Sequence, residues 1–552
     1  MTDKILHPKP LQLDYMLEHS PSKTRESGST AVTYLNIQPQ REDTTVHGRF
    51  VAGDAFFNYG AMGGLREGLP VVELISSSHC GLLVNAIVMG FASMFFQYVF
   101  QVLLLADYSS AQEAQSNAAK YLLQWPGAFS VFFGLLSDCF PLFGLRRKSY
   151  MILGWSMACI MFVAMVIVCH LTDPADVTRG YLLLIFSIFA AFGFQIAYIS
   201  AFAMTIELAQ REHLYQRGHL QSLYMVWYYV FATLAQVIAA LILKRDDFGV
   251  TFTPTINMIE AAAILAGMCV VPIPFLLFGL QEDQIESQHV TFGRRVVELW
   301  QLLRWKVVYR VLFFLCVSLF LSAAYDSNVG TAMAFWSGIT AKTSAWIKVS
   351  EFLARLVGVM LFKSFFVNYS WRRLAIIGLV TNVVAKTILG GPTIYGAVRN
   401  DWYMYIWTLI SDIYLGIFDI FALVIPTEIA DVGREGAVIG LVNSFTVLIS
   451  IATYTLWASV SDAVGASVDI VAILVDLDET RQKVMITGVI YLVVNLLAVG
   501  APFFVPNQKL DAQQLRAFGG YNKLGRVLIV STFVVLLVYC LVANVLKIVN
   551  KE

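Results

Sequence analysis

The stretch GLLSDCFPLFGLRRKSY, residues 134–150, joins two apolar segments and is the most informative part of the chain. Because Gly134 has no side chain, it is expected to let its helix approach a neighbouring helix closely. Asp138 is expected to face the positive end of an adjacent helix, where a carboxylate is stabilised. The stretch ends with Gly144 and three cations that suit carboxylates or lipid phosphates, namely Arg146, Arg147 and Lys148. The pattern therefore predicts a latch between two parts of a helical membrane protein.

The composition also indicates a membrane protein. Of 552 residues, 58% are hydrophobic and 14% are charged, whereas soluble domains average about 25% charged residues. The formal net charge is zero, which argues against a nucleic-acid-binding surface. The seven cysteines are dispersed without CxxC spacing, so we expect no metal site and no cofactor. No nucleotide-binding loop or nucleophile elbow is visible, so we do not expect an enzyme.

Thirteen segments have close to the roughly 20 apolar residues that a helix needs to cross the hydrocarbon core. They are residues 81–106, 120–138, 150–171, 181–208, 221–243, 256–279, 308–325, 344–366, 373–391, 403–429, 436–460, 484–505 and 527–548. The fold class expected is therefore an all-α polytopic membrane protein with 12 or 13 spans. Whether the last segment crosses the bilayer or lies in its surface stays open at this point.

Polar stretches divide the chain into five expected parts. They are a cytoplasmic, largely disordered N-terminal tail at 1–75, an N-terminal six-helix half at 76–279, a cytoplasmic linker at 280–307, a C-terminal six-helix half at 308–505, and a loop with an additional C-terminal helix at 506–552. Basic residues in short loops are retained in the cytoplasm. Their distribution places the N-terminus inside, with the plasma membrane as the default location.

Two motifs carry a resemblance to a known family. Residues 137–155 read SDCFPLFGLRRKSYMILGW, and residues 426–436 read PTEIADVGREG. These segments are similar to the folate-biopterin transporter family within the major facilitator superfamily, and the resemblance covers most of residues 75–505. The run Cys139, Phe140 and Pro141 stands where the superfamily usually has Arg-x-Gly, which favours this subfamily. The resemblance implies two six-helix halves that carry a folate or pteridine by alternating access, in symport with protons.

A motif that occurs twice in the chain supports its division into two related six-helix halves. Residues 205–212 read TIELAQRE and residues 427–435 read TEIADVGRE, each at the end of an apolar segment. Substrate is expected between such halves near the membrane midplane. Glu207 and Glu428 are expected to form gate or loop ion pairs with the neighbouring Arg211 and Arg434.

A charged side chain inside a predicted span is costly unless it has an oppositely charged partner, faces a water-filled cavity or serves a function. Lys348, Glu351 and Arg355 share one face of the eighth span, and Asp412 and Asp419 share one face of the tenth. In the functional interpretation, Arg355, with Lys348, binds a substrate carboxylate, while Asp412, Asp419 or Glu351 exchanges a proton. In the alternative, these charges are permanent ion pairs that hold the two helices together.

Polar and aromatic residues of the first half are further candidates for substrate binding. They are Gln97 and Gln101 in the first span, Gln195 and Tyr198 in the fourth, and Tyr228 in the fifth. A fused heteroaromatic ring offers matching hydrogen-bonding edges and a face on which tyrosine stacks. Alternatively, these side chains bridge membrane helices.

Other functions remain open from the sequence. The cargo is expected to be a small molecule, with protons and the lipid bilayer as further partners. A nucleoside-like or amino-acid-like cargo, or a scaffold or sensor that does not transport, is an alternative. The sequence does not identify a protein partner.

Overall fold

The computed structural model describes residues 64–66, 69–107, 122–172, 177–245, 252–282, 292–324, 327–468 and 470–549. The predicted tail lies mostly outside these residues. The described part is helical throughout, apart from one short pair of strands, β1 (Leu243–Arg245) and β2 (Phe252–Pro254), which pair antiparallel.

The first half of the bundle runs from α3 to α11. Its elements are α3 (Cys80–Phe95) continued by η2 (Phe96–Phe100) and α4 (Gln101–Asp107), then η3 (Trp125–Phe129), α6 (Ser130–Cys139), α7 (Lys148–Leu171), α8 (Val177–Ala209), α9 (His219–Ile242), α10 (Met258–Val270) and α11 (Pro272–Gly279). The π-helical turn η2 interrupts the first span, and Pro272 separates α10 from α11, since proline cannot donate the helical hydrogen bond.

The second half follows the linker helix α12 (Phe292–Leu302). It comprises α13 (Lys306–Ser322), α14 (Ser327–Trp336), α15 (Ala341–Leu361) with η4 (Phe362–Phe366), α16 (Trp371–Ile394), α17 (Asp401–Ile429), α18 (Glu435–Ala463), α19 (Ile470–Val475) and α20 (Asp478–Leu497) with η5 (Ala498–Phe504). The chain ends with α21 (Lys509–Phe518) and α22 (Lys523–Val549).

Ten helices within the described residues are long and apolar enough to cross a membrane. They correspond to ten of the thirteen predicted segments, including the last, at Lys523–Val542. The other three are helical but differ in build. The second is divided between η3 and α6, the seventh is α13 with 17 residues, and the eighth, α15, carries four charges. The chain is therefore a multi-pass membrane protein.

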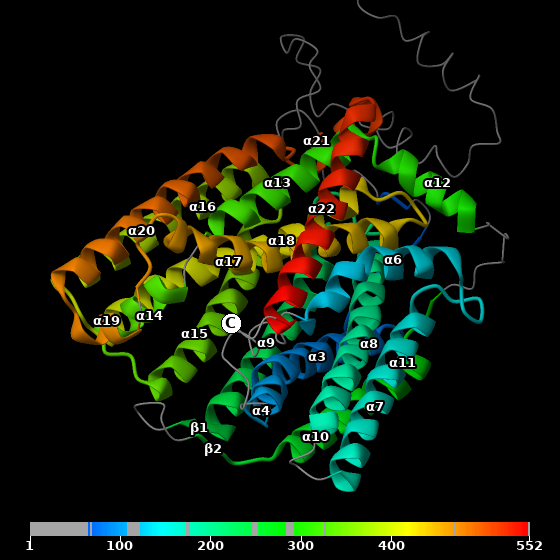
Figure 1. Ribbon diagram of the computed structural model, residues 1–552. Coiled ribbons are helices and arrows are strands. Elements are labelled where there is room, and N and C mark those ends of the chain that lie inside the picture. The colour runs from blue at the N-terminus through cyan, green and yellow to red at the C-terminus, as the bar shows by residue number, and fades with distance from the viewer. Residues whose placement is uncertain are drawn as a thin grey trace, which may run out of the picture.

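The two halves lie side by side, with the first half on the right of Figure 1 and the second on the left. Each half has its own packed pairs, such as α3 with α9 and α15 with α17. Across the interface, α6 packs on α18 and α9 packs on α15. The α6–α7 loop lies at the right of Figure 1, α12 at the upper right and α21 at the top, and we call the end of the bundle that they mark the loop side.

Candidate functional site

The halves make their closest contact where α6 crosses α18. A Cβ atom at Gly134 would lie 1.9 Å from the carbonyl oxygen of Gly436, so only glycine fits there. The carboxylate of Asp138 accepts hydrogen bonds from the backbone N–H groups of Gly436, at 3.2 Å, and Ala437, at 2.7 Å. These N–H groups belong to the first turn of α18, where the helix dipole stabilises a negative charge. Gly134 and Asp138 thus have the surroundings that the sequence led us to expect.

Arg147 joins this contact from the α6–α7 loop. Its side chain is fully buried, with Nη2 2.6 Å from Asp138 and 3.0 Å from Glu435 of α18. Its Nη1 also donates to the hydroxyl of Ser137, at 2.6 Å. Burial lowers the pKa of Arg147, but Asp138, Glu435 and Glu207 outweigh it and raise the pKa above its usual value. Arg147 therefore stays charged and ties the first half to α18.

Arg66 is a second cation in this network that the sequence did not indicate. It lies in the stretch predicted to be a tail, yet Nη1 is 2.9 Å from Glu207 of α8, and Nη2 binds Glu435. Its Nε donates to the side chain of Gln210 at 3.1 Å. The preceding residue, Leu65, is 4% exposed. Arg66 thus bridges the two halves. Together with Asp138, Arg147, Glu207 and Glu435 it forms what we call the loop-side gate.

A neighbouring cluster of ion pairs joins further segments on the loop side. Glu428, at the end of α17, pairs with Arg217 of the α8–α9 loop at 3.0 Å, rather than with the expected Arg434. Arg434 instead pairs with Asp431, at 3.0 Å, and with Glu298 of α12, at 3.5 Å. Arg434 thus pairs with a carboxylate three residues before it and with the linker helix, while Glu428 pairs with the first half. Glu428 also accepts from Gln513 of α21, at 2.6 Å.

Gly144 and Arg146 shape the loop itself. Gly144 has φ of +77°, a left-handed conformation that favours glycine. The backbone N–H groups of Arg146, Arg147 and Lys148 donate to the carboxylate of Glu282, at 2.8 to 2.9 Å. Glu282 follows α11, so it fixes the start of α7 to the end of the first half.

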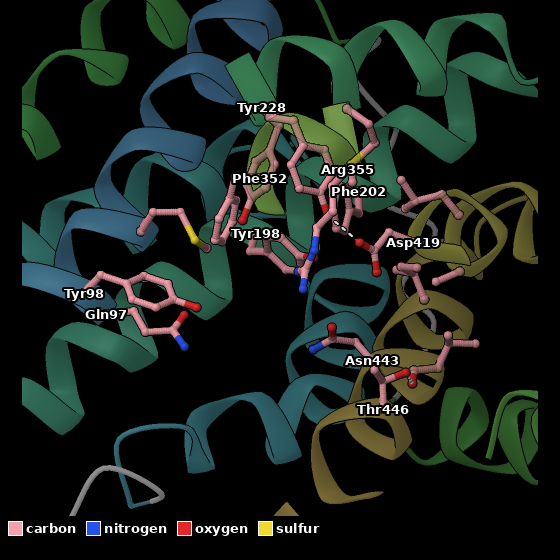
Figure 2. Close-up of a pocket in the computed structure, with 17 residues that line it drawn as sticks. Gln97, Tyr98, Tyr198, Phe202, Tyr228, Phe352, Arg355, Asp419, Asn443 and Thr446 are labelled. Carbon is pink, nitrogen blue, oxygen red and sulfur yellow. Dashed lines mark hydrogen bonds between the residues drawn. The ribbon is translucent and has the colours of Figure 1, made fainter. Parts of the chain in front are cut away.

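A cavity of about 280 Å³ lies between the halves. Each half contributes three helices to its wall: α3 with η2, α8 and α9 from the first half, and α15, α17 and α18 from the second. It is lined by Met94, Gln97, Tyr98, Tyr198, Phe202, Met225, Tyr228, Tyr229, Phe352, Arg355, Asp419, Ala422, Leu423, Ile439, Val442, Asn443 and Thr446. Figure 2 shows Gln97 and Tyr98 on one wall, with Arg355, Asp419 and Asn443 facing them across the open space.

Arg355 is the cation of the cavity. Its Nε lies 3.2 Å from Oδ1 of Asp412 on the adjacent α17, and its guanidinium group stacks over Phe352 at 5.3 Å. The two helices touch here, because a Cβ at Gly416 would lie 2.2 Å from the carbonyl oxygen of Arg355. Asp412 is 6% exposed and does not line the cavity. Asp412 therefore contacts Arg355 on the side away from the cavity, while the guanidinium group points into the cavity.

Asp419 is the anion of the cavity. The hydroxyl of Tyr229 on α9 donates a hydrogen bond to its Oδ2, which links the two halves. Tyr229 also packs edge-on against Tyr228, with ring centroids 5.3 Å apart, and Tyr98 packs edge-on against Phe352, at 5.8 Å. The cavity thus combines one cation, one carboxylate and several aromatic rings.

Several predicted candidates lie outside the cavity lining. Lys348 and Glu351 pair with each other at 2.7 Å, and the side chain of Lys348 is 47% exposed. Gln195 donates to the hydroxyl of Ser130, at 2.8 Å, and Gln101 is buried within the first half. Of the predicted substrate and proton residues, the lining includes Gln97, Tyr198, Tyr228, Arg355 and Asp419.

Sequence reasoning missed the contribution of α18. Asn443 and Thr446 stand three residues apart in an apolar helix and line the cavity together. Asn443 also donates to the hydroxyl of Ser130, at 2.8 Å, next to the α6–α18 crossing. This polar pair at helical spacing was a signal that the sequence contained. Tyr229 and Phe352 had no such signal, since aromatic residues are common throughout the chain.

The fold, the cavity between its halves and the family match place the chain among the secondary transporters of the major facilitator superfamily. The BT1 family model matches residues 89–498, so the chain belongs to the BT1 family of folate-biopterin transporters. The search of curated proteins gives no significant match.

Two solved structures are similar in fold. The proton:xylose symporter XylE bound to 6-bromo-6-deoxy-D-glucose has a TM-score of 0.55 and 13% identity, covering 80% of this chain and 98% of that chain. The major facilitator superfamily transporter FucP in the outward conformation has a TM-score of 0.48 and 11% identity, covering 76% and 98%. At this identity the first of them supports the fold alone.

Proposed function

We propose that this protein carries an anionic heteroaromatic solute of the folate or pteridine class across a membrane, by alternating access and in symport with protons. The observation that carries the proposal is the cavity between the halves, where Arg355 and Asp419 face a space walled by aromatic rings. Its volume of about 280 Å³ lies near the lower end of the range of about 300–1,000 Å³ for ligand pockets.

Each wall of the cavity matches one part of such a solute. The guanidinium group of Arg355 suits a carboxylate, because its planar fork binds both oxygens. The carboxylate of Asp419 suits the amino and ring N–H groups along one edge of a pterin. Tyr98, Tyr198 and Tyr228 offer faces and edges for ring contacts.

The loop-side gate supports alternating access. Arg66, Arg147 and Asp138 join the halves on the loop side. We therefore expect the solute to reach Arg355 from the opposite side in this conformation. Transport to the loop side requires these ion pairs to break. The basic residues at the loop side support a cytoplasmic location for it and for the N-terminus.

The Arg355–Asp412 pair offers a route for proton coupling. Asp412 holds Nε of Arg355 most strongly while it is ionised, since a protonated carboxyl loses the charge that attracts the guanidinium group. Protonation of Asp412 would free Arg355 to bind the solute carboxylate more fully. A proton and an anionic solute would then enter together.

Uptake of radiolabelled folate and biopterin into cells that express the chain tests the proposal. We expect saturable uptake that is faster at external pH 5.5 than at pH 7.5 and that is lost in Arg355→Gln. Surface labelling confirms that both proteins reach the membrane. If the wild type takes up neither compound but takes up a nucleoside or an amino acid, the substrate class is wrong while the transporter assignment stands. If it transports nothing in such a panel, a scaffold or sensor role is favoured.

A further inference from the structure

A basic and aromatic surface lies on the loop side, beside the gate but sharing none of its ion pairs. It forms where the linker helix α12, the start of α13 and the start of α22 meet. The backbone N–H of Asn522 donates to the carbonyl of Arg304 at 2.8 Å, and that of Lys306 donates to the carbonyl of Gly520 at 3.2 Å. These bonds hold the beginnings of α13 and α22 side by side. We call Trp300, Arg304, Lys306, Tyr521, Lys523 and Arg526 the basic surface.

The cations of the basic surface have aromatic neighbours instead of acidic ones. The guanidinium group of Arg526 lies 4.3 Å from the ring centre of Trp300, and that of Arg304 lies 5.9 Å from the ring centre of Tyr521. Within the described residues, none of Arg304, Lys306, Lys523 and Arg526 forms an ion pair. The buried Nε atoms of Arg304 and Arg526 also have no hydrogen-bond acceptor among those residues. The charge at this place is therefore uncompensated by the part of the protein described.

Two helix N-termini add to the positive charge. Lys306 is the first residue of α13 and Lys523 is the first residue of α22, and neither helix has an acidic residue in its first turn. A helix N-terminus carries a partial positive charge, so a lysine there is unfavourable without an anion. At these termini the N–H of Lys306 donates to Gly520 and that of Leu524 donates to the side chain of Asn522. The positive ends of the helices, rather than these N–H groups, therefore attract a phosphate group. The two helix N-termini and their lysines thus favour the binding of an anion from outside the chain.

The surroundings of the basic surface are apolar. On α22, Leu524 is 64% exposed, Val527 53% and Leu528 55%. On α12, Val297 is 53% exposed and Trp300 43%. Because α22 is one of the helices apolar enough to cross a membrane, these side chains meet acyl chains while the cations stand at the level of the headgroups. Tryptophan and tyrosine prefer the same level of the bilayer.

We propose that the basic surface binds the phosphate of an anionic phospholipid. The acyl chains of the lipid would lie along the exposed side chains of α22, and the phosphate would lie between Arg304, Arg526 and the two helix N-termini. An acidic protein would satisfy the cations but not the exposed leucine and valines beside them, so a lipid fits both features. The bound lipid would tie the linker between the halves to the additional C-terminal helix.

Thermal unfolding of the purified full chain in detergent micelles tests this assignment. Phosphatidylglycerol, phosphatidylcholine and inorganic phosphate are each titrated into the protein. We expect phosphatidylglycerol to raise the melting temperature, and Arg304→Gln with Arg526→Gln to raise the half-effective lipid concentration by roughly tenfold, since each basic residue contributes to attraction of anionic lipid. Arg373→Gln removes an exposed arginine at the start of α16 and serves as the matched control.

A second variant separates lipid binding from damage to the fold. Lys306→Gln with Lys523→Gln changes two exposed side chains that form no ion pair with a described residue, and it should weaken the response to phosphatidylglycerol in the same direction. Equal stabilisation of wild type and both double variants would overturn the proposal. So would equal stabilisation by phosphatidylcholine, or an effect of inorganic phosphate as large as that of the lipid.

Discussion

Nε of Arg355 lies 3.2 Å from Oδ1 of Asp412, so a carboxylate that does not line the cavity fixes the cation that does. Within the described residues, the terminal nitrogens of Arg355 donate to no protein acceptor. Arg355 is therefore oriented by one contact and free to make others, which is the arrangement that recognition of a solute carboxylate requires.

Arg355→Lys should reduce uptake at least tenfold, although the charge is kept. Lysine has no planar fork, so it cannot contact Asp412 and bind a carboxylate bidentately at the same time. Initial rates of uptake against solute concentration measure the effect. Lys348→Gln is the control, because Lys348 is half exposed and, among the described residues, forms an ion pair only with Glu351 on its own helix. A loss of similar size in Lys348→Gln would contradict the role given to Arg355.

Tyr229→Phe should raise the KM for uptake by roughly 5- to 20-fold, because a hydrogen bond to a charged group contributes about 1.5–3 kcal/mol and part of it is regained by water. The change removes the bond that fixes Asp419 but leaves the ring packing intact. Tyr414→Phe is the control, since the Tyr414 hydroxyl has no hydrogen-bond partner among the described residues and Tyr414 does not line the cavity. If both changes leave the KM unaltered, Asp419 does not contact the solute.

Gly134→Ala should destabilise the conformation in which the loop side is closed. The new Cβ would lie 1.9 Å from the carbonyl oxygen of Gly436, and overpacking of this kind costs about 1–3 kcal/mol. Melting temperature and the alkylation rate of a cysteine placed at Ile439 measure the change. Gly267→Ala has no atom within 4 Å of its new Cβ and should be neutral or slightly stabilising. Equal melting temperatures in the two variants would count against the close contact.

Arg147→Gln should destabilise the protein by about 3–5 kcal/mol, since it leaves buried carboxylates without their partner. Glu435→Gln in the same chain should recover part of this loss, because Arg147 and Glu435 lie 3.0 Å apart and interact directly. The free energies of unfolding of the wild type, the two single variants and the double variant form a complete double-mutant cycle. Additive losses would mean that the pair does not contribute as a unit.

Lys509 gives a prediction for pH. Its side chain is 2% exposed, donates to the carbonyl of Leu214 at 3.1 Å, and faces Glu428, Arg217 and Glu212. Burial lowers the pKa of Lys509 to about 7. The unfolded chain therefore binds more protons between about pH 7 and pH 10, and stability from this residue falls as the pH falls through that window.

Lys509→Met removes this dependence. Relative to wild type, the variant should be more stable at pH 7 than at pH 9.5, by up to about 1.4 kcal/mol for each pH unit in the window. The same burial raises the pKa of Glu212 to about 7, against the hydrogen bonds that it accepts from Gly218 and Leu220. Glu212→Gln in the wild-type background separates the two groups. Parallel stability curves for wild type and Lys509→Met would rule out a buried titrating lysine.

The close contact where α6 crosses α18 was predictable from the sequence because its parts depend on backbone geometry. A glycine at a helix crossing and a carboxylate at a helix N-terminus act through backbone atoms, so a short local motif specifies them. Gly134 and Asp138 have that geometry in the structure. Arg66 was not predictable, since it acts through a side chain from a polar stretch without periodicity.

Which candidate residues line the cavity was only partly predictable, because the spacing of residues along a helix does not fix how the helix is rotated about its axis. Gln97 and Gln101 share a face of a regular helix, but the π-helical turn Phe96–Phe100 widens the first span between them. As a result Gln97 lines the cavity while Gln101 is buried in the first half. Similarly, Lys348 and Arg355 stand seven residues apart, yet Lys348 meets Glu351 and Arg355 meets Asp412.

Arg66 has a consequence for the kinetics of the gate. It is joined to the first span by fewer than fifteen residues, so its guanidinium group meets Glu435 at an effective concentration in the millimolar range or above. Free cations in a cell compete poorly against such a tethered group. The variant Arg66→Gly would lack the tethered guanidinium group. Added guanidinium salt at millimolar concentration would then replace the missing side chain in proportion to its concentration.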